Sequence, residues 1–495
     1  AVEAGDIEGG DLAHNGTWLV MGLDSGKRCL RAAFRACIVT DQAAARCLPG
    51  GPRRAATMSH QARRPTPGTP PTRPISSLYV AVNIVDLQRT FRRSSARIFR
   101  VTLASRPHRV HWLHMQRSLR ILHTEAAMGL GGQEIYIFRH MIAMRARGHD
   151  VSLLCQPGAR LGALAQANGF IVHRLRMGGL VRLLRGIDQV AALVRSHRFD
   201  VVNTTSRRDA LIAAAGARLA RAPLVVRSRH LMSPVNSLLT YTGLPHRVLT
   251  VSRFVKQQLV ARGIQEGHIG VVPPIAMPPQ WHGVRGPDPW QCLQDTRARV
   301  RAELGFDTGD VVVGCVAVLR RPKGHMDLLR AIAPLCHAHP WLHLAVIGDG
   351  EPVMTELRTA SQRLGLQRQV HLLGHRSDAQ RLMAGLDVFA LATHKEAAGT
   401  VFLEAAFVGV PIVATRVGGV PEMVREGDNA LLVEPGDPTA LTTALQCLVE
   451  QPGLRRRMGR AGWDWMRSDD RFSPVGHCRA TEACYYQWLE ELGHA

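Results

Sequence analysis

The sequence predicts an α/β protein built from two domains, each with a parallel β-sheet covered by helices. From residue 119 to about residue 470, short apolar runs alternate with amphipathic helical segments, which is typical of parallel sheets. This alternation is interrupted once, at the pairs Pro273-Pro274, Pro278-Pro279 and Gly286-Pro287. The chain has 495 residues, 46% of them hydrophobic, and is therefore long enough for two cores.

The first half of the alternating region contains six apolar runs that we expect to form strands. A helix is expected between the first two runs, because Ile135, Phe138 and Met141 recur at helical spacing and Gly148 follows them. The expected strands cover residues 119–123, 151–154, 171–173, 200–203, 224–227 and 248–251.

The second half repeats the alternation and ends in a helix over about residues 473–492. Its expected strands cover residues 311–318, 343–347, 369–373, 387–391, 411–414 and 430–433. Because ligands of open α/β sheets bind beyond the carboxyl ends of the strands, two such domains predict a cleft between them. The predicted parts are a disordered or non-native extension (1–115), an N-terminal domain (116–280), a C-terminal domain (281–472) and a C-terminal helix (473–495).

Residues 1–115 differ in composition from the rest of the chain. They hold 17 Lys and Arg against 7 Asp and Glu, show no sustained helical or strand period, and include the Pro/Thr/Arg-rich stretch 64–74. Disorder is therefore expected. One alternative is an organellar transit peptide, against which the acidic residues at the extreme N-terminus argue. The other is an over-extended reading frame, because Met115 lies just before the first strand pattern.

The net charge of +23 and the pI near 10.9 call for an anionic partner. Acidic lipid headgroups and phosphorylated substrates fit this charge, whereas an aromatic content of only 5% disfavours a nucleic-acid platform. No apolar run reaches the length of a transmembrane helix. The ten cysteines lack a C-x-x-C pair, which fits a reduced cytoplasmic compartment. No metal site is predicted, since Cys336, His337 and His339 precede Pro340 at an expected helix end.

Residues 393–424 carry the most specific pattern. Glu396 follows a buried strand, and Glu404 lies eight residues later in a helix that is expected to begin near Gly399 and Thr400. Free backbone N–H groups at a helix start bind diphosphate, whereas carboxylates accept hydrogen bonds from sugar hydroxyls. Since the neighbours of Glu404 are apolar, its carboxylate is expected to have a partner. Plain loop and helix acids are the alternative interpretation.

A basic turn follows the first strand of the second domain and contains Arg320, Arg321 and Lys323. Cations at this place would neutralise the charge that develops on a leaving diphosphate, which other transferases do with a metal ion. A solvated basic turn is the alternative interpretation.

Taken together, this region resembles the signature of the glycosyltransferase family 4 enzymes: Glu396-x7-Glu404, Gly409-Val-Pro411, Gly418-Gly419 and Pro421-Glu422. The resemblance covers about residues 119–470 and implies the GT-B fold, in which two Rossmann-like domains face a cleft. It implies that Glu404 binds the nucleotide ribose and that Glu396 is catalytic and faces the transferred sugar. It also implies that the amides at Gly399 and Thr400 hold the donor diphosphate, and that the anomeric configuration is retained without a metal ion or other cofactor.

The chain departs from the family pattern in two places. Family members usually carry Gly-Arg where this chain has Ala317-Val318. Arg320 is therefore the expected substitute on the donor diphosphate, beside the better-matched Lys323, with Arg321 as an alternative. Family members also commonly have a Pro-Asn-Gly-Val-Asp turn, which residues 273–277 replace here, so the usual contacts of that turn are not expected.

Two features of the first half complete the predicted site. His230 follows a strand and matches a position where related enzymes often carry a histidine that faces the transferred sugar, and a structural histidine is the alternative. The glycine loop 129–132 is a weak dinucleotide fingerprint, so a dehydrogenase is disfavoured. The resemblance implies instead that Gly132 lets the backbone approach the donor diphosphate, and a simple turn requirement is the alternative.

Residues 180–198 combine arginines with leucines and valines. Such a basic amphipathic face would suit an anionic membrane that carries a lipid-linked acceptor, and a helix that only covers the sheet is the alternative. We therefore expect a cytoplasmic protein in peripheral contact with the inner face of the plasma membrane.

These observations predict a retaining hexosyltransferase that moves a sugar from a nucleoside-diphosphate sugar to an acceptor hydroxyl of a lipid-linked or cell-surface glycan, as in polysaccharide or lipopolysaccharide biosynthesis. The N-terminal domain would take the acceptor and the C-terminal domain the donor. Two other functions fit the sequence: a non-catalytic polyanion- or membrane-binding protein on a GT-B shell, and a GT-B sugar-nucleotide epimerase. The donor base, the sugar, the acceptor and the oligomeric state are not predicted.

Overall fold

The computed structural model describes residues 117–235, 237–276 and 288–494, together with the backbone of three strands nearer the N-terminus. The chain divides into two compact units, Ala1–Leu113 and His114–Ala495. In the first unit, the described strands form an antiparallel sheet in the order β2-β1-β3, where no regular structure was expected. They are short, mostly apolar runs: β1 (Trp18–Leu23), β2 (Arg35–Val39) and β3 (Leu78–Asn83). The rest of the predicted extension 1–115 lies outside the described residues.

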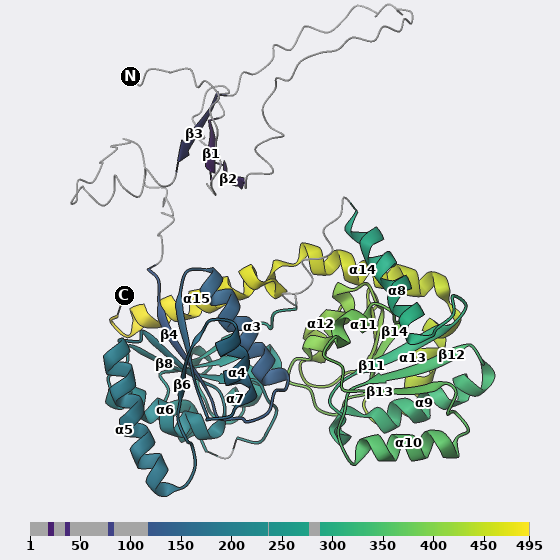
Figure 1. Cartoon of the computed structure of the whole chain (residues 1–495), viewed down its shortest axis with the longest axis horizontal. Helices are drawn as coiled ribbons and strands as arrows, with labels where there is room; N and C mark the ends of the chain where they lie inside the picture. The colour runs from purple at the N-terminus through teal and green to yellow at the C-terminus, as the bar shows by residue number, and fades with distance from the viewer. Residues whose placement is uncertain are drawn as a thin grey trace, which may run out of the picture. The chain divides into compact units, whose positions relative to one another are not determined.

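The N-terminal domain of the second unit is built on a parallel sheet, which has seven strands among the described residues (Figure 1). The strand order is β10-β9-β8-β7-β4-β5-β6. The six expected strands are present, whereas β10 was not expected because its three residues include Gly270 and form too short a run. The strands are β4 (Arg120–Glu125), β5 (Asp150–Cys155), β6 (Ile171–Arg174), β7 (Val201–Thr204), β8 (Leu224–Arg229), β9 (Arg247–Thr250) and β10 (Ile269–Val271).

Helices cover the sheet with two separate hydrophobic clusters, as both faces of a parallel sheet require. One cluster joins the sheet to α3 and α4 through Ile137, Met141 and Leu161. The other joins it to α5 and α6 through Val190 and Ile212. The helices are α3 (Gly132–Ala146), α4 (Arg160–Ala167), α5 (Leu180–His197), α6 (Arg207–Leu219) and α7 (Arg253–Val260), with a π-helical turn η1 (Leu239–Gly243).

The C-terminal domain is built on a second parallel sheet, with six described strands in the order β13-β12-β11-β14-β15-β16. All six were expected, and the first ends at Val316 rather than at residue 318. The strands are β11 (Val311–Val316), β12 (Leu342–Ile347), β13 (Val370–Gly374), β14 (Val388–Leu391), β15 (Ile412–Thr415) and β16 (Ala430–Val433). The predicted boundary between the domains, between residues 280 and 281, lies outside the described part of the chain.

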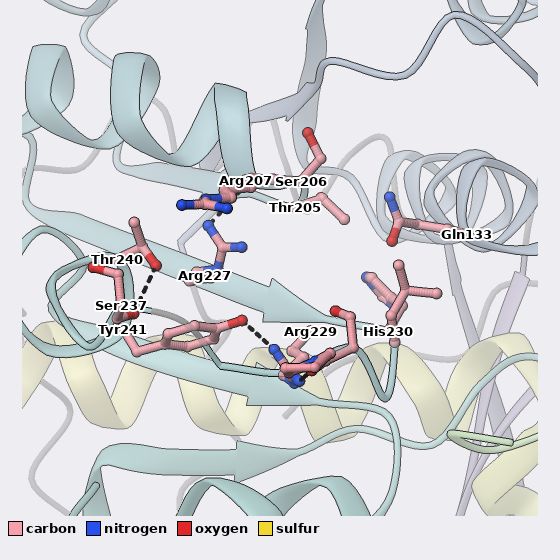
Figure 2. A pocket seen from close by; sticks show the side chains of 13 residues that line it. Gln133, Thr205, Ser206, Arg207, Arg227, Arg229, His230, Ser237, Thr240 and Tyr241 are labelled. Atoms are coloured by element: carbon pink, nitrogen blue, oxygen red, sulfur yellow. Dashed lines mark hydrogen bonds between the residues drawn. The ribbon is translucent and has the colours of Figure 1, made fainter. Parts of the chain in front are cut away.

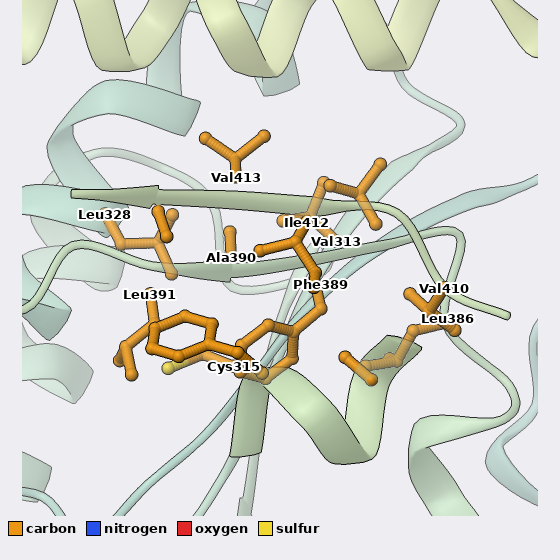
Figure 3. Packing of buried hydrophobic residues seen from close by; sticks show 14 of the residues in the cluster. Val313, Cys315, Leu328, Leu386, Phe389, Ala390, Leu391, Val410, Ile412 and Val413 are labelled. Atoms are coloured by element: carbon orange, nitrogen blue, oxygen red, sulfur yellow. The ribbon is translucent and has the colours of Figure 1, made fainter. Parts of the chain in front are cut away.

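Most of the core of this domain is one large apolar cluster between the sheet and its helices, and a smaller cluster contains Val300, Ile347 and Leu382. Figure 3 shows part of the large cluster, where Phe389 of β14 packs among Cys315, Leu328 and Ile412. Continuous apolar runs make these strands, because both of their faces are buried. The helices are α8 (Pro289–Leu304), α9 (His325–Ala338), α10 (Val353–Arg363), α11 (Ala379–Met383), α12 (Thr400–Phe407), α13 (Pro438–Glu450) and α14 (Pro452–Ser468), with 3-10 turns η4 (Arg321–Lys323) and η5 (Val420–Glu422).

The last helix, α15 (Pro474–Glu491), belongs by its contacts to the N-terminal domain, although it follows the C-terminal domain in the sequence. It is the yellow helix that reaches the C-terminus in Figure 1. Tyr485 and Trp488 are buried in the same cluster as α3, and Asn203 Nδ2 of β7 donates to Tyr485 Oη at 2.7 Å. The helix was predicted, but this return to the first domain was not. Among the described residues, no helix is long and apolar enough to cross a membrane.

Candidate functional site

The loops after three neighbouring strands of the C-terminal domain meet at one edge of its sheet. Strand β11 pairs in parallel with β14, and β14 with β15, so their carboxyl ends lie side by side. Gly324, after β11, has φ of +69°, and a Cβ there would lie 1.8 Å from the carbonyl oxygen of Ala392 after β14. Only glycine allows this approach, which brings the basic turn η4 against the loop that carries Glu396.

Lys323 and Glu396, which the sequence placed in one site, are in direct contact. Lys323 Nζ lies 2.5 Å from Glu396 Oε2, and both side chains are largely buried. The Glu396 carbonyl oxygen accepts a hydrogen bond from Gly419 N at 3.0 Å. An ammonium group and a carboxylate are thus fixed beside the start of α12.

The two arginines of the same turn behave differently. Arg321 Nη2 lies 2.8 Å from Glu356 Oε1 of α10, and its side chain is 77% exposed. Arg320 is exposed, and its side chain makes no ion pair or hydrogen bond within the described ranges. Lys323 is therefore the cation of this turn that lies against Glu396, while the role of Arg320 stays a prediction.

Helix α12 begins at Thr400 as expected, directly after Gly399. Gly399 has φ of +86°, and a Cβ there would meet the Phe402 ring at 2.6 Å. The chain can therefore enter the helix in this conformation only with glycine. The first backbone N–H groups of this eight-residue helix, with the positive end of its dipole, can bind the oxygens of a diphosphate.

Glu404, on the same helix, has the partner that its apolar surroundings predicted. Its Oε1 accepts from Arg139 Nη1 of α3 at 2.9 Å and from Gln380 Nε2 at 2.8 Å. The Arg139 guanidinium also donates to the Ile275 carbonyl at 3.2 Å. Arg139 was missed because its partner lies 265 residues away in the other domain. The signal that could have found it is a charged residue at i+4 from Ile135, on the apolar face of α3.

Three further contacts join the loops of the two domains. Ser252 Oγ donates to the Ala397 carbonyl at 2.5 Å. The Glu422 carboxylate accepts from the backbone N–H groups of Arg253 and Phe254, both at 2.8 Å, and so caps α7 of the other domain. The loop that carries Glu396 is thereby tied to the N-terminal domain.

A cavity lined only by residues of the N-terminal domain lies at the carboxyl ends of β7 and β8. Its volume is about 180 Å³. Figure 2 shows Gln133, His230 and three arginines around it. Its lining residues are Gln133, Thr205, Ser206, Arg207, Arg227, Arg229, His230, Leu231, Ser233, Pro234, Ser237, Thr240 and Tyr241.

His230 lies at the boundary between this cavity and a group of buried histidines. Its ring centroid is 4.3 Å from that of Tyr136, and neither ring nitrogen has a hydrogen-bond partner. Burial lowers the pKa of His230 to about 3, so the ring is neutral at pH 7. A neutral imidazole can donate to a ligand through one nitrogen and accept through the other.

The glycine loop 129–132 leads directly into α3. Gly132 is the first residue of the helix, and a Cβ there would meet open space. Gly131 N donates to Glu134 Oε2 at 2.6 Å, and Gln133 Nε2 to Glu125 Oε2 at 2.6 Å. Burial and the charge of Asp209 raise the pKa of Glu125 to about 7. The assignment of Gly132 to the diphosphate stays a prediction.

No group of three or more histidine, cysteine or acidic side chains is arranged to hold a metal ion in the part of the chain that the structure describes. Cys336 is buried in α9, His337 Nε2 is 2.8 Å from the Leu364 carbonyl, and His339 is 3.3 Å from Glu450. These three residues therefore point to different partners.

Two family models match the two domains. The model described as "Glycosyltransferase Family 4" matches residues 130–275, and the model described as "Glycosyl transferases group 1" matches residues 296–465.

The curated relatives that match are glycosyltransferases. D-inositol 3-phosphate glycosyltransferase of Corynebacterium jeikeium is 35% identical over 200 residues, which cover 36% of this chain and 48% of that protein. Lipopolysaccharide core biosynthesis glycosyltransferase LpsE of Rhizobium meliloti is 32% identical over 162 residues, or 33% of this chain and 46% of that protein. The chain thus spans about half the length of these relatives.

Solved structures match over both domains. A glycosyltransferase from Rickettsia africae has a TM-score of 0.65 at 19% identity, over 75% of this chain and 99% of that one. Anabaena Alr3699/HepE in complex with UDP and glucose has a TM-score of 0.62 at 21% identity, over 74% of this chain and 99% of that one. These likenesses confirm the predicted GT-B fold of two Rossmann-like domains.

Proposed function

We propose that this protein, which carries a Glycosyltransferase Family 4 domain followed by a Glycosyl transferases group 1 domain on a GT-B fold, is a retaining hexosyltransferase. It moves a sugar from a nucleoside-diphosphate sugar to the hydroxyl of a glycan or lipid-linked acceptor. The observation that carries the proposal is the contact of Lys323 Nζ with Glu396 Oε2 at 2.5 Å, beside the start of α12.

In this proposal the donor lies across the carboxyl ends of β11, β14 and β15. The N–H groups at Gly399 and Thr400 bind the diphosphate, Lys323 and Arg320 neutralise its charge, and Glu404 accepts hydrogen bonds from the ribose. The binding of UDP by Anabaena Alr3699/HepE, which has the same fold, supports a nucleotide donor.

The reaction retains configuration by exchange on one face of the sugar. The bond between C1 and the diphosphate oxygen breaks, the acceptor oxygen bonds to C1 from the same side, and the hydroxyl proton passes to the leaving diphosphate. Lys323, Arg320 and the start of α12 stabilise the negative charge that develops on the diphosphate, in the place of a metal ion. Glu396 and the neutral His230 orient the transferred sugar through its hydroxyls.

The acceptor comes from the side of the N-terminal domain, and we propose that α5 holds this domain against an anionic membrane. Val181 and Leu184 on α5 are 63% and 64% exposed, and Arg182 and Arg185 lie between and beside them. Exposed apolar side chains among arginines are the composition of helices that lie in a lipid headgroup layer. The location predicted from this contact is the inner face of the plasma membrane.

Thermal stabilisation of the full chain by UDP-, GDP- and ADP-sugars, followed by turnover of the stabilising donor, tests the function. We expect one nucleotide class to raise Tm, and Glu404→Ala to abolish turnover while the protein stays folded by circular dichroism. Full activity of Glu404→Ala would refute the proposed site. Conversion of the donor without any acceptor would identify an epimerase, and salt-sensitive polyanion binding indifferent to Glu396 and Glu404 would identify a non-catalytic protein.

A further inference from the structure

Three arginines line the cavity of the N-terminal domain, and no acidic residue does. Arg207 lies at the start of α6, and Arg227 and Arg229 lie at the end of β8. None of the residues around this cavity of about 180 Å³ is Asp or Glu. A small cavity with this lining has a strongly positive potential, which attracts an anionic group.

Two of the three guanidinium groups are held rigidly. Arg227 Nη1 donates to the Ser206 carbonyl at 3.1 Å, and its guanidinium lies 4.7 Å from the centre of the Tyr241 ring. Arg229 donates to Tyr241 Oη and to the Ser233 carbonyl. Both side chains are buried, with exposed fractions of 5% and 6%. They are therefore oriented before any ligand arrives, which lowers the entropic cost of binding.

Several buried polar atoms around the cavity have no hydrogen-bond partner in the described part of the chain. They are Nε of Arg227, Nε of Arg229, Oγ1 of Thr205 and both ring nitrogens of His230. A buried donor without an acceptor is destabilising, and more so when it carries charge. Two guanidinium Nε–H donors and a hydroxyl group at one cavity call for a ligand with several acceptor oxygens.

One carboxylate behind the cavity offsets only part of this charge. Asp209 is fully buried and accepts from Thr124 Oγ1 at 2.5 Å, from Thr205 N at 2.8 Å and from Ser206 Oγ. Burial raises its pKa, and these hydrogen bonds and the charge of Arg227 act in the opposite direction. Even when Asp209 is ionised, its single charge is smaller than that of the three arginines that line the cavity, so the cavity keeps a surplus of positive charge.

The cavity also adjoins the loops that follow β14 and β15 of the C-terminal domain. Leu231, Ser233 and Pro234 line it, and Met232 between them reaches the other domain. A Cβ on Gly418 would lie 2.9 Å from Met232 Sδ and 1.9 Å from the Glu396 carbonyl oxygen. Segment 231–234, which lines the cavity, is thus close to Gly418, and Gly418 packs against the backbone of Glu396.

We infer that this cavity recognises an anionic group, a phosphate monoester or a carboxylate, which the acceptor carries close to the hydroxyl that is glycosylated. The inference rests on the proposed function, because it assigns the cavity to the acceptor of that reaction. Arg207, Arg227 and Arg229 bind the oxygens of the anion, and Thr205 adds a hydroxyl contact. A neutral sugar would leave the guanidinium groups without counter-charge.

Three probes that share one sugar skeleton test the inference on the full chain by isothermal titration at fixed ionic strength: glucose 6-phosphate, glucuronate and glucose. We expect glucose 6-phosphate or glucuronate to bind at least about tenfold more tightly than glucose, since one charge-assisted hydrogen bond contributes about a factor of ten. The anion that binds more tightly identifies the source of the charge.

Arg207→Gln and Arg208→Gln are a matched pair, because both residues are exposed neighbours on α6 and only Arg207 lines the cavity. We expect Arg207→Gln to weaken anion binding about tenfold and Arg208→Gln to change it less than twofold. Arg227→Lys, which keeps the charge but removes the Nε–H and the fork, should also weaken it. Lys323→Ala should leave it unchanged.

Equal binding of the three probes, or equal losses in Arg207→Gln and Arg208→Gln, would overturn the inference, because the net charge alone would then explain the data. Loss of binding in Lys323→Ala alone would also overturn it and would place the anion in the donor site. Anion binding that depends on Arg207, without stabilisation by any nucleotide sugar, would contradict the proposed function and leave the anion site intact.

Discussion

The charged groups around Glu396 and Glu404 and those of the cavity in the N-terminal domain are arranged differently. Glu396 and Glu404 already have cationic partners, Lys323 and Arg139, while the exposed side chain of Arg320 makes no ion pair or hydrogen bond within the described ranges. Among the described residues, the Nε atoms of Arg227 and Arg229 have no hydrogen-bond partner, and no acidic residue lines the cavity of the N-terminal domain. The two carboxylates of the first region are therefore paired without ligand, whereas the Nε–H groups of Arg227 and Arg229 have no acceptor among the described residues.

This difference determines which existing contacts each proposed ligand would have to replace. In the proposed donor site, a nucleotide sugar would exchange partners with Lys323, Glu396 and Glu404, so its affinity would be the difference between two sets of contacts. An anionic acceptor has no such competitor and only supplies oxygens to donors that are already fixed. The pairs Lys323–Glu396 and Arg139–Glu404 also avoid the cost of a buried unpaired charge when no ligand is bound.

Among the basic side chains of the turn after β11, Lys323 should have the largest effect on turnover when it is replaced. Lys323→Ala removes the cation that would stabilise the leaving diphosphate, and removal of one such group lowers kcat by about 10²–10³-fold. Steady-state rates with saturating donor measure this effect. The matched control is Arg321→Ala on the same turn, which should stay within about twofold because Arg321 is exposed and pairs with Glu356. Equal losses in the two variants would contradict the assignment of Lys323.

The buried histidines on the acceptor side should make stability depend on pH. Burial lowers the pKa of His123 and His230 to about 3 and that of His477 to about 4, each below the unfolded value of 6.5. Between pH 6.5 and about 4 the unfolded state therefore binds more protons, and the free energy of unfolding falls as pH falls.

Urea unfolding at pH 7.5 and 5.5 measures this loss. Each histidine contributes about 1 kcal/mol of it, so His123→Asn should reduce the loss by about that amount. His375→Asn, an exposed histidine of the C-terminal domain, should leave the loss unchanged. A pH dependence that is identical in wild type and His123→Asn would show that this group of histidines is not buried in neutral form.

The smallest effect is expected at the outer surface of the acceptor domain. The exposed Val181 and Leu184 should contribute to binding of vesicles with anionic lipids, and Val181→Asp should reduce the bound fraction severalfold in co-sedimentation. The control is Val475→Asp, which makes the same substitution at a residue of α15 that is 47% exposed. If both variants bind as wild type does, α5 does not face the membrane.

The fold could be predicted from the sequence because buried parallel strands are continuous apolar runs. Residues 311–316 and 388–391 are examples, since a short apolar run without alternation is typical of a strand that is buried on both faces. Strand β10 escaped detection because three residues around Gly270 carry no periodic signal. The packing of α15 on the N-terminal domain could not be predicted, because the local sequence around Tyr485 and Trp488 does not indicate which core they join.

Part of the site followed from the topology alone. Lys323 and Glu396 follow strands that were expected to be parallel, and the carboxyl ends of parallel neighbours share one edge. The pairing of Arg139 with Glu404 depends on contacts between two domains, which no local pattern encodes. Arg227 and Arg229 were visible as neighbours of His230, but their shared cavity depends on how Tyr241 and Ser233 fold back over β8.

The place of α15 has a consequence for the order of folding. The core of the N-terminal domain includes Tyr485 and Trp488, which are synthesised only after the whole C-terminal domain. At about 5–20 residues per second, the surface that these side chains cover stays open for tens of seconds on the ribosome. The domain that is translated first is therefore completed last, and its exposed apolar face during that interval is where assistance by chaperones would act.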